Sequence, residues 1–442
     1  MALSTPSTIR TLQRKLYRKA KSESGFRFYA LYDKVSRADI LSHAYALVRA
    51  NKGASGIDGR TWAAIDAEEG KAGFLRKLQA ELKSKRYRAQ AVRRVWIPKP
   101  DGSQRPLGIP TIKDRVVQMA VKLVIEPIFE ADFCETSYGF RPRRSAHDAA
   151  DAVAEALRAG YGYVIDADLS QYFDRIPHAK LMAVVAERIA DGAVLALLHQ
   201  WLKAPVVEED TQGTTRKSGG KRCRWGTPQG GVISPLLANL YLHVLDRTWA
   251  RPEVGRGLRA KLVRYADDLV VLCAREVTPS LKVLRHLLGR LGLRLNEEKT
   301  REVNAWKERF DFLGFSFGLR KGRKSGKVYP HVEPSPQSIQ RVKTRVTQMT
   351  ARRLTPIPLP HVVGTLNQYL RGWAGYFHYR NCSTALSRVK WQVEERLRTH
   401  LRKRHKVKSR ATGYEQFSTR LLYARYGLFK LPTTAGWTRA HA

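Results

Sequence analysis

Two adjacent carboxylates, Asp267 and Asp268, lie in "RYADDLVVLCA" (residues 264–274), between two short apolar runs. This pattern predicts a strand, a tight turn and a second strand. Like charges that are partly removed from water repel each other unless a cation lies between them. Because Mg²⁺ prefers carboxylate oxygens and keeps sites for water and phosphates, a magnesium site is one interpretation. The ordinary alternative for either residue is an Asp that stabilises the turn itself.

A third carboxylate is available in "VIDADLSQYFDRI" (164–176), which contains Asp166, Asp168 and Asp174. The segment 161–169 reads as a buried strand. In a strand, Asp166 and Asp168 point to the same face, so the sequence period leaves the choice between them open. Three carboxylates from two neighbouring strands could hold two ions for in-line phosphoryl transfer. One ion would activate a 3′-hydroxyl and the other would neutralise the leaving pyrophosphate.

Positive charge dominates the composition. The chain has 80 Lys and Arg against 39 Asp and Glu, a formal net charge of +41, which indicates a nucleic-acid partner. A non-enzymatic RNA-binding protein would carry the same charge, so composition says nothing about catalysis. With 442 residues, 43% of them hydrophobic, the chain can form two or three folded domains, which excludes a disordered basic tail.

Cysteine usage and hydropathy bear on the compartment. The four cysteines are scattered without a CxxC pair, which argues against a zinc ribbon or disulfide framework and suits a reducing cytosol. The sequence shows no signal-peptide apolar region and no apolar run of membrane-spanning length. We therefore expect a soluble intracellular protein.

Strand and helix signals alternate up to about residue 320, and helical patterns follow from about residue 335. The sequence thus predicts an α+β domain and then a helical one, with the boundary at the composition shift in 325–336. Ser145 is the expected N-cap of one helix, and Pro235 the first residue of another. The other predicted elements are a basic helical lead-in over 1–35, strands in 93–110 and 309–319, helices over 61–90, 115–133, 145–160, 234–250 and 279–293, and a loop or exposed hairpin over 206–224.

The stretch "YADD" resembles the Y-x-D-D signature of reverse transcriptases, and the blocks around it resemble, in order, those of group II intron-encoded proteins. One such motif alone would be a weak signal, whereas a long series in register is specific. The resemblance runs from about residue 45 to the C-terminus. The blocks are "KGASGIDG", "IPKPDGSQRPLGIP", "KDRVVQ", "YGFRPRRSAHDA", "DADLSQYFDRIPH", "GTPQGGVISPLLANLYLHVLD", "RYADDLVVL", "GLRLNEEKT" and "FLGFSF".

This resemblance implies a right-hand polymerase fold, α+β, with reverse-transcriptase fingers and palm before an all-helical thumb and maturase domain and a basic tail. It implies an RNA-directed DNA polymerase that also binds group II intron RNA to assist splicing and retrohoming. The chain lacks the paired cysteines of the family's zinc-dependent endonuclease domain, so it resembles the bacterial type without that domain. The implied domains are a basic N-terminal extension (1–35), fingers and palm (36–325), thumb and maturase domain (326–400) and a basic nucleic-acid-binding segment (401–442).

The resemblance assigns the catalytic role and the binding of two Mg²⁺ ions to Asp168, Asp267 and Asp268, with help from the main-chain carbonyl of Leu169. It selects Asp168 over Asp166, so the other two acids of that segment are interpreted as structural and salt-bridged. Deoxynucleoside triphosphates are the implied substrates.

Five residues are expected to bind the incoming nucleotide. Phe173 matches a bulky aromatic that clashes with a 2′-hydroxyl and admits only deoxynucleotides, although a core aromatic is the ordinary alternative. Lys99 and Arg105 flank the "PDGSQ" turn and match positions that bind the triphosphate. Gln229 and Gly230, in "TPQGG", match the segment beneath the nascent base pair, where glycine allows close backbone approach.

Template and intron RNA contacts are expected at basic residues. The "Trp-Ala-Gly-Tyr-Phe-His-Tyr" stripe over 373–379 is interpreted as core instead of a base-stacking platform. Arg141 and Arg144 are expected at the template or triphosphate, and the run 401–410 at phosphates. The residues of that run assigned to nucleic acid are Arg402, Lys403, Arg404, Lys406 and Lys408.

The expected partners are group II intron RNA and template RNA with a DNA primer or DNA target, and no membrane, for a monomer or homodimer. The expected location is the bacterial cytoplasm, with nucleoid association when DNA is bound. One alternative is a domesticated relative that acts in defence, CRISPR adaptation or DNA repair. Another is a non-catalytic RNA-binding splicing factor. DNA flanking the gene that folds as a group II ribozyme would separate the first reading from the domesticated one.

Overall fold

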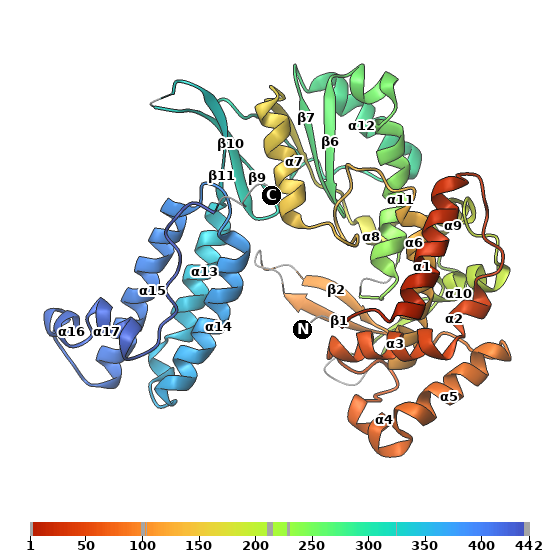
Figure 1. Cartoon of the computed structure of the whole chain (residues 1–442), viewed down its shortest axis with the longest axis horizontal. Helices are drawn as coiled ribbons and strands as arrows, with labels where there is room; N and C mark the ends of the chain where they lie inside the picture. The colour runs from red at the N-terminus through yellow and green to blue at the C-terminus, as the bar shows by residue number, and fades with distance from the viewer. Residues whose placement is uncertain are drawn as a thin grey trace.

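The computed structural model shows an α+β fold in three parts (Figure 1): N-terminal helices at the lower right, a sheet with flanking helices at the top, and a C-terminal helical arm at the left. The arrangement agrees with the expected right-hand polymerase fold. The structure describes residues 3–98, 102, 104–209, 215–227, 230–323 and 325–436.

The N-terminal part is built around one long apolar helix, α6 (Ile112–Glu130). Thr111 caps this helix by accepting a hydrogen bond from the Asp114 amide. Helix α1 (Ser7–Ser22) packs on α6 and buries Ile9 and Leu16 in the main core, so the predicted N-terminal extension belongs to this unit. The remaining helices here are α2 (Tyr32–Val35), α3 (Ala38–Ala50), α4 (Trp62–Glu68) and α5 (Gly70–Lys83).

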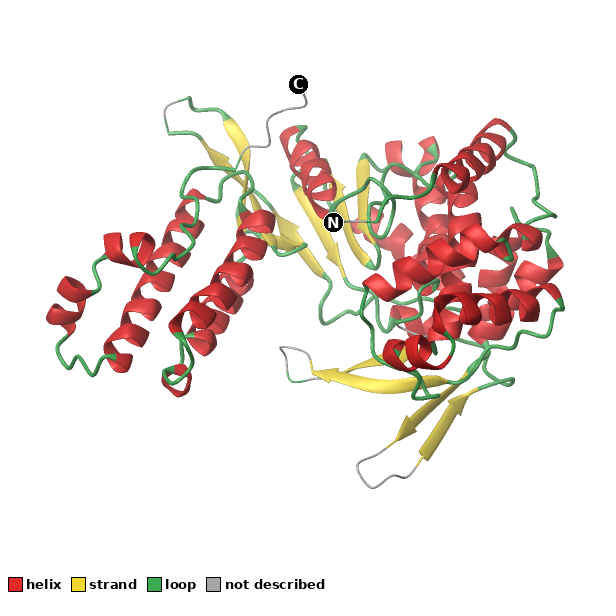
Figure 2. Ribbon diagram, turned by 60° about the horizontal axis from the view of Figure 1, so that its bottom comes forward, coloured by secondary structure: helices red, strands yellow, loops and turns green. Residues whose placement is uncertain are grey.

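A four-stranded sheet of order β2-β1-β4-β5 extends from this part. The predicted hairpin in 93–110 is confirmed as β1 (Val92–Pro98) and β2 (Gln104–Ile109). The polar segment 206–224 also forms a hairpin, which projects from the body of the molecule (Figure 2). Its strands are β4 (Pro205–Glu209) and β5 (Thr215–Gly219), and the helices before it are α9 (His178–Ala186) and α10 (Gly192–Leu202).

The acidic residues belong to a second sheet, of order β6-β7-β3-β8. Its inner strands are apolar on both faces, since Ile165 and Val271 enter one core cluster and Val164 and Val270 another. The strands are β3 (Tyr163–Ala167), β6 (Ala260–Tyr265), β7 (Asp268–Cys273) and β8 (Arg301–Asn304). The helices are α7 (Ala146–Arg158), α8 (Tyr172–Arg175), α11 (Ser234–Trp249) and α12 (Thr278–Leu291), with a short π-helical turn η1 (Pro252–Arg256). The expected Ser145 cap is confirmed, and α11 begins at Ser234, one residue before the expected first position Pro235.

A three-stranded sheet leads into the helical arm. The single strand predicted over 309–319 is two strands, because Leu313 and Gly314 turn the chain with φ of 53° and 81°. The predicted boundary between residues 325 and 326 falls inside the next hairpin. The Gly- and Lys-rich composition of this segment marks the turn of the hairpin, and helices begin only at Pro336. The strands are β9 (Phe310–Phe312), β10 (Phe315–Lys321) and β11 (Val328–Pro334).

The arm has its own apolar core. Trp373 is buried there and Tyr379 is buried against the neighbouring cluster, which confirms the core interpretation of the aromatic stripe. Helix α15 (Ser383–Arg404) runs through residue 401, so the predicted separate segment 401–442 begins within a helix. No helix in the described ranges is both long and apolar enough to cross a membrane. The other helices are α13 (Pro336–Met349), η2 (Arg352–Leu354), α14 (Leu359–Phe377), α16 (Arg410–Gln416) and α17 (Thr419–Ala424).

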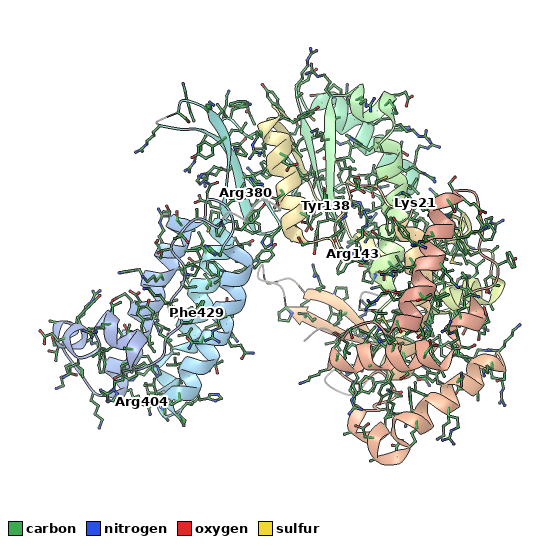
Figure 3. All side chains as sticks on the ribbon, viewed as in Figure 1. Lys21, Tyr138, Arg143, Arg380, Arg404 and Phe429 are labelled. Carbon is green, nitrogen blue, oxygen red and sulfur yellow. The ribbon has the colours of Figure 1, made fainter. Side chains whose placement is uncertain are left out.

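Helix α7 joins the sheet to the arm. The His147 ring lies against Tyr376 and Tyr379, with ring centroids 5.0 and 4.7 Å away, and its Nε2 is 2.8 Å from the Tyr376 carbonyl oxygen. Arg380 forms an ion pair with Asp151 of the same helix. Figure 3 labels Arg380 at this junction. The arm is therefore fixed to the part that carries the acidic residues.

Candidate active site

The turn between β6 and β7 carries Asp267 and Asp268 to the end of β3, which confirms the predicted strand, turn and strand. Strand β3 pairs antiparallel with β7, with Ala167 opposite Leu269. The next positions along this register, Asp168 and Asp268, face each other where the ladder ends. The structure thus brings the three predicted catalytic acids to one edge of one sheet.

Burial and neighbouring acids raise the pKa of Asp268 and of Asp267. Burial raises the pKa of Asp268 to about 7, and the charges of Asp267, Asp168 and Asp166 add to this effect. Burial also raises the pKa of Asp267, while Arg105 opposes the rise and Asp168 adds to it. Although protein crowds its carboxyl group, Asp268 stays accessible to solvent, so an ion or substrate can reach it.

The site fits a divalent cation in its donors and its charge. Each of the three neighbouring acids outweighs Arg105 in its effect on Asp268, so negative charge here is not compensated. Among the residues that the structure describes, no three acidic, histidine or cysteine side chains are close enough to enclose a metal ion. The described acids thus do not form a three-ligand metal site, and an ion held here by one or two of them would keep several waters, as Mg²⁺ commonly does.

A buried arginine positions the turn from behind. Arg264 is fully buried and forms an ion pair with Asp246 of α11, which is also fully buried. Its Nη1 donates to the carbonyl of Ala266 (2.9 Å), in the turn itself, and to Asn239 Oδ1 (2.9 Å), while its Nη2 donates to Ser137 Oγ (2.6 Å). One guanidinium thus ties the turn to a helix and to a loop.

Two further contacts restrict this turn. Ala266 has a left-handed φ of 57°, which costs a non-glycine residue free energy and needs support from its surroundings. Gly139 lies so close that a Cβ there would be 2.4 Å from the Ala266 amide nitrogen. Asn239 Nδ2 donates to the Gly139 carbonyl (2.6 Å) and so holds that loop in place.

Our sequence reasoning missed Arg264, Asn239 and Asp246. The signal for Arg264 was a charge inside an apolar strand. The signal for Asn239 and Asp246 was an amide and an acid seven positions apart on one face of an apolar helix. Buried charges need partners, so these residues could have been matched to one another from the sequence.

The segment after β3 is held by the stretch at 294–296. The Asp168 carbonyl accepts a hydrogen bond from the Asn296 amide (2.8 Å), and the Ser170 amide donates to the Arg294 carbonyl (3.0 Å). Within the described ranges the Leu169 carbonyl accepts no hydrogen bond, so it is available as the predicted additional ligand.

Phe173 lies in α8, just beyond this segment. Its ring is half-buried and packs edge-on against Tyr172, with ring centroids 5.3 Å apart. Its carbonyl accepts a hydrogen bond from the Thr227 amide (2.8 Å), which joins α8 to the strip before Gly230. A partly exposed ring that is anchored in this way can act as a wall, so the predicted gate stays a prediction.

The nucleotide-binding residues are described only in part. Arg105 is exposed on β2, and its charge acts on both Asp267 and Asp268. Gly230 has φ of 104°, and a Cβ there would be 2.4 Å from the Gly108 carbonyl oxygen, so its close approach is to β2. The expected residues Lys99 and Gln229 lie outside the described residues.

The predicted nucleic-acid role of Arg141 is wrong. Its side chain is buried and makes an ion pair with Glu130 (2.7 Å) and hydrogen bonds to two backbone carbonyls, so it stabilises the loop before α7. Arg144 is half-buried and paired with Glu135. The neighbouring Arg143 is exposed, with φ of 59°, and is the residue of this motif that faces solvent (Figure 3).

The predicted salt bridges of Asp166 and Asp174 are not found among the described residues. Burial raises the pKa of Asp166 to about 6, and Arg301, opposite it on β8, lowers that pKa. Burial also raises the pKa of Asp174, which Arg94 lowers. Asp166 therefore adds to the uncompensated negative charge beside Asp268.

The basic run over 401–410 divides into two groups. Arg402 donates to the Lys408 carbonyl (2.6 Å), and Arg404 to the carbonyls of Thr355 and Ile357 (2.6 and 2.7 Å), so these two arginines stabilise the end of α15. The run lies at the end of the arm away from its junction, where Figure 3 labels Arg404. The exposed cations, still predicted to contact phosphates, are Lys403, Lys406 and Lys408.

Comparison with known families identifies both halves of the chain. Residues 97–317 match the family described as reverse transcriptase (RNA-dependent DNA polymerase), and residues 339–417 match the group II intron maturase-specific domain. The chain belongs to the group II intron-encoded reverse transcriptases and maturases. The maturase match covers α13 to α16, so the arm is the maturase-specific part of this family.

Similar proteins of this family occur in bacteria and plants. The chain is 35% identical to protein YkfC of Escherichia coli (strain K12), over 72% of this chain and 91% of that protein. It is 34% identical to the group II intron-encoded protein LtrA of Lactococcus lactis subsp. cremoris, over 64% of this chain and 44% of that protein. It is 28% identical to nuclear intron maturase 2, mitochondrial, of Arabidopsis thaliana, over 32% and 23%. The chain thus spans less than half of the latter two relatives.

Among solved structures, a Candida tropicalis apo telomerase aligns with a TM-score of 0.39 at 15% identity, over 54% of each chain. A similarity at this level carries no argument about function.

The turn network predicts a specific effect of Arg264→Lys. Lysine keeps the charge that pairs with Asp246 but loses the donors to Asn239 and Ala266, so we expect a destabilisation of about 1–3 kcal/mol. Because the substitution should displace the acidic turn but not the nucleotide-binding residues, kcat for primer extension should fall with little change in the nucleotide KM. The control is Arg247→Lys at an exposed ion pair with Glu187, which should change neither quantity. Wild-type kcat in folded Arg264→Lys would contradict this role.

The raised pKa of Asp268 predicts that its carboxylate destabilises the metal-free fold. The folded-state pKa lies above the unfolded value, so the unfavourable charge appears as pH rises through that range. Asp268→Asn should therefore raise the melting temperature at about pH 8 without divalent ions, with a smaller gain below about pH 4. Added Mg²⁺ should stabilise the wild type more than the variant. Asp33→Asn, at a largely exposed acid, is the control; an equal effect at both acids would refute the assignment.

Proposed function

We propose that the protein is an active RNA-directed DNA polymerase whose catalytic centre is formed by Asp168, Asp267 and Asp268. The observation that carries this proposal is the concentration of uncompensated carboxylates at one sheet edge, within a chain of net charge +41. If these acids had only a structural role, we would expect one of the many Lys or Arg side chains of the protein to lie beside them. A site for Mg²⁺ and a triphosphate leaves that position open.

The residues of the chain divide the chemistry between them. When bound, two magnesium ions would supply the activation of a primer 3′-hydroxyl and the neutralisation of the leaving pyrophosphate. Asp168 and Asp268 would hold those ions from facing positions on β3 and β7, and the Leu169 carbonyl would add an oxygen. Arg105, whose charge reaches both Asp267 and Asp268, would bind the triphosphate.

The sugar of the incoming nucleotide would be selected by Phe173. Its half-buried ring follows the catalytic strand and packs against Tyr172, and its backbone carbonyl accepts a hydrogen bond from the Thr227 amide. A rigid ring beside the sugar excludes a 2′-hydroxyl by steric contact, so the enzyme would use deoxynucleoside triphosphates.

The polymerase would act on the RNA of a group II intron and assist its splicing. Support comes from the maturase-specific match over residues 339–417 and from the net positive charge. Template RNA with a DNA primer or target would lie beside the acids. Exposed Lys403, Lys406 and Lys408 at the far end of the arm would contact RNA phosphates. Its bacterial relatives suggest that this takes place in the bacterial cytoplasm, at the nucleoid when DNA is bound.

Primer extension on an RNA template with Mg²⁺ tests the catalytic assignment. The double variant Asp267→Ala/Asp268→Ala should lose about 10³-fold or more of the wild-type rate, because removing residues that act as a unit abolishes the chemical step. Asp168→Asn should show a similar loss. Asp174→Asn, in the same segment but assigned no catalytic role, is the matched control and should stay within a few-fold of wild type. Equal rates in wild type and the double variant would leave only an RNA-binding protein.

The sugar gate predicts that Phe173→Ala incorporates ribonucleotides at least about tenfold more readily than the wild type, relative to deoxynucleotides. The cause is removal of the wall beside the 2′ position. Single-nucleotide incorporation with matched ribo- and deoxynucleotides measures the ratio. Phe173→Tyr keeps the ring and should keep the selectivity. If alanine leaves the ratio unchanged, Phe173 is a core residue.

A further inference from the structure

A cavity on the N-terminal side of the molecule has no role in the chemistry described above. Its volume is about 710 Å³, within the range of ligand-binding pockets. It is lined from α2, the loop after α5, α10 and the segments around the β4–β5 hairpin. In Figure 1, α2, α5 and α10 lie at the lower right, away from β6 and β7 at the top. The cavity is therefore separate from the candidate active site.

The lining of the cavity is strongly basic. It contains four cations and one histidine but no carboxylate among the described residues. Two buried acids lie behind the lining, and both already have partners. Asp191 accepts hydrogen bonds from backbone amides of Leu31, Tyr32, Ala193 and Val194, and Asp114 accepts them from the Tyr87 hydroxyl and the Gln90 amide. The positive charge therefore faces the cavity without a counter-charge. The basic residues are Lys85, Arg88, His199, Lys203 and Lys221.

Several of these cations are held in position by the backbone. Arg88 Nη1 donates to the carbonyls of Lys85 and Tyr87 (both 2.8 Å), and Lys203 Nζ donates to the Lys221 carbonyl (2.7 Å). Lys85 follows the C-cap of α5 with a left-handed φ of 56°, a position at which glycine is common. The sequence keeps a lysine there despite the conformational cost. Cations fixed in this way lose little further entropy on binding an anion.

The cavity also has an apolar floor and neutral hydrogen-bonding groups. Ala193, Ala196 and Leu197 of α10 form the floor. Gln200 Oε1 accepts a hydrogen bond from the Ala89 amide (3.1 Å), which leaves its NH₂ group as a donor. Apolar surface and an amide donor beside fixed cations match a nucleotide, whose base is flat and apolar on its faces and whose phosphate is anionic.

We propose that this cavity binds one nucleotide of a single-stranded RNA segment, with its base on the α10 floor and its flanking phosphates on the cations. The inference rests on the proposed function, which makes RNA the partner. A duplex keeps its bases stacked and cannot place one in the cavity. Helix polarity accounts for Lys85 after the end of α5 and for His199 and Lys203 near the C-terminus of α10, but not for Arg88 and Lys221, which come from other segments.

Photocrosslinking tests the site in the full-length protein. A short single-stranded RNA that carries photoactivatable thiouridine is crosslinked, and modified peptides are identified by mass spectrometry. We expect an adduct within 193–204 or 85–89. Ala196→Trp, at an exposed helix position that fills the cavity without changing charge, should abolish that adduct and leave others intact. No adduct there, or one unaffected by Ala196→Trp, overturns the proposal.

Two matched double charge reversals distinguish RNA binding in the cavity from general electrostatic attraction between RNA and the protein. Lys85→Glu/Arg88→Glu reverses two lining residues, whereas Lys83→Glu/Arg86→Glu reverses two exposed neighbours that do not line the cavity. The first pair should lower the slope of log affinity against log salt by about 1.4 for two lost phosphate contacts, and the second pair should not. Equal slopes in both variants overturn the proposal. So does equal competition for the adduct by a polyglutamate peptide, which would make the site a general anion pocket.

The outcome of the crosslinking and salt-dependence experiments does not depend on polymerase activity. Cavity variants should extend a short annealed primer at the wild-type rate, because the cavity lies away from the acids. Conversely, Asp267→Ala/Asp268→Ala should keep the adduct. If the wild type has no polymerase activity but still forms the adduct, the proposed polymerase function is wrong and the proposed RNA site is supported.

Discussion

The buried ion pair between Arg264 and Asp246 is the interaction on which the candidate site depends. Both side chains are fully buried, and losing one partner of such a pair costs about 3–5 kcal/mol because a charge is left uncompensated. The same guanidinium reaches the Ala266 carbonyl, so the position of the acidic turn is coupled to the packing of α11. The turn therefore cannot move without disturbing the packing of the core around α11.

This arrangement explains how one sheet edge can hold several acids. Apolar residues on both faces fix β3 and β7, and the ladder stops where Asp168 and Asp268 face each other. Burial raises the pKa of Asp268 to about 7, and the neighbouring acids, which the rigid backbone keeps from separating, add to this effect. The chain has a net charge of +41, yet Arg105 does not offset the effect of the neighbouring acids on Asp268. Bound metal ions would supply the missing positive charge.

Local patterns predicted most of the fold. The β6–β7 hairpin and the Ser145 cap depend on residues close in sequence and are confirmed, and α11 begins at Ser234, one residue before the predicted Pro235. The sequence patterns missed long-range partners: Arg141 reads as an exposed cation until Glu130 is found beside it, and Arg264 until Asp246 is. The domain boundary near 325 stays a prediction, since turn-forming residues look the same in a hairpin and in a linker. The three acids were assigned through the family resemblance, because strand period alone does not separate Asp166 from Asp168.

The most direct test of the central claim is the ionisation of Asp268 itself. Carbon-13 NMR of the protein labelled at aspartate carboxyl carbons, with Asp268→Asn to assign the signal, would follow its titration with and without Mg²⁺. The account predicts a pKa of about 7 without the ion and a clear fall when Mg²⁺ is added. An ordinary pKa of about 4 that does not respond to Mg²⁺ would contradict it, since the acids would then neither crowd one another nor share a cation.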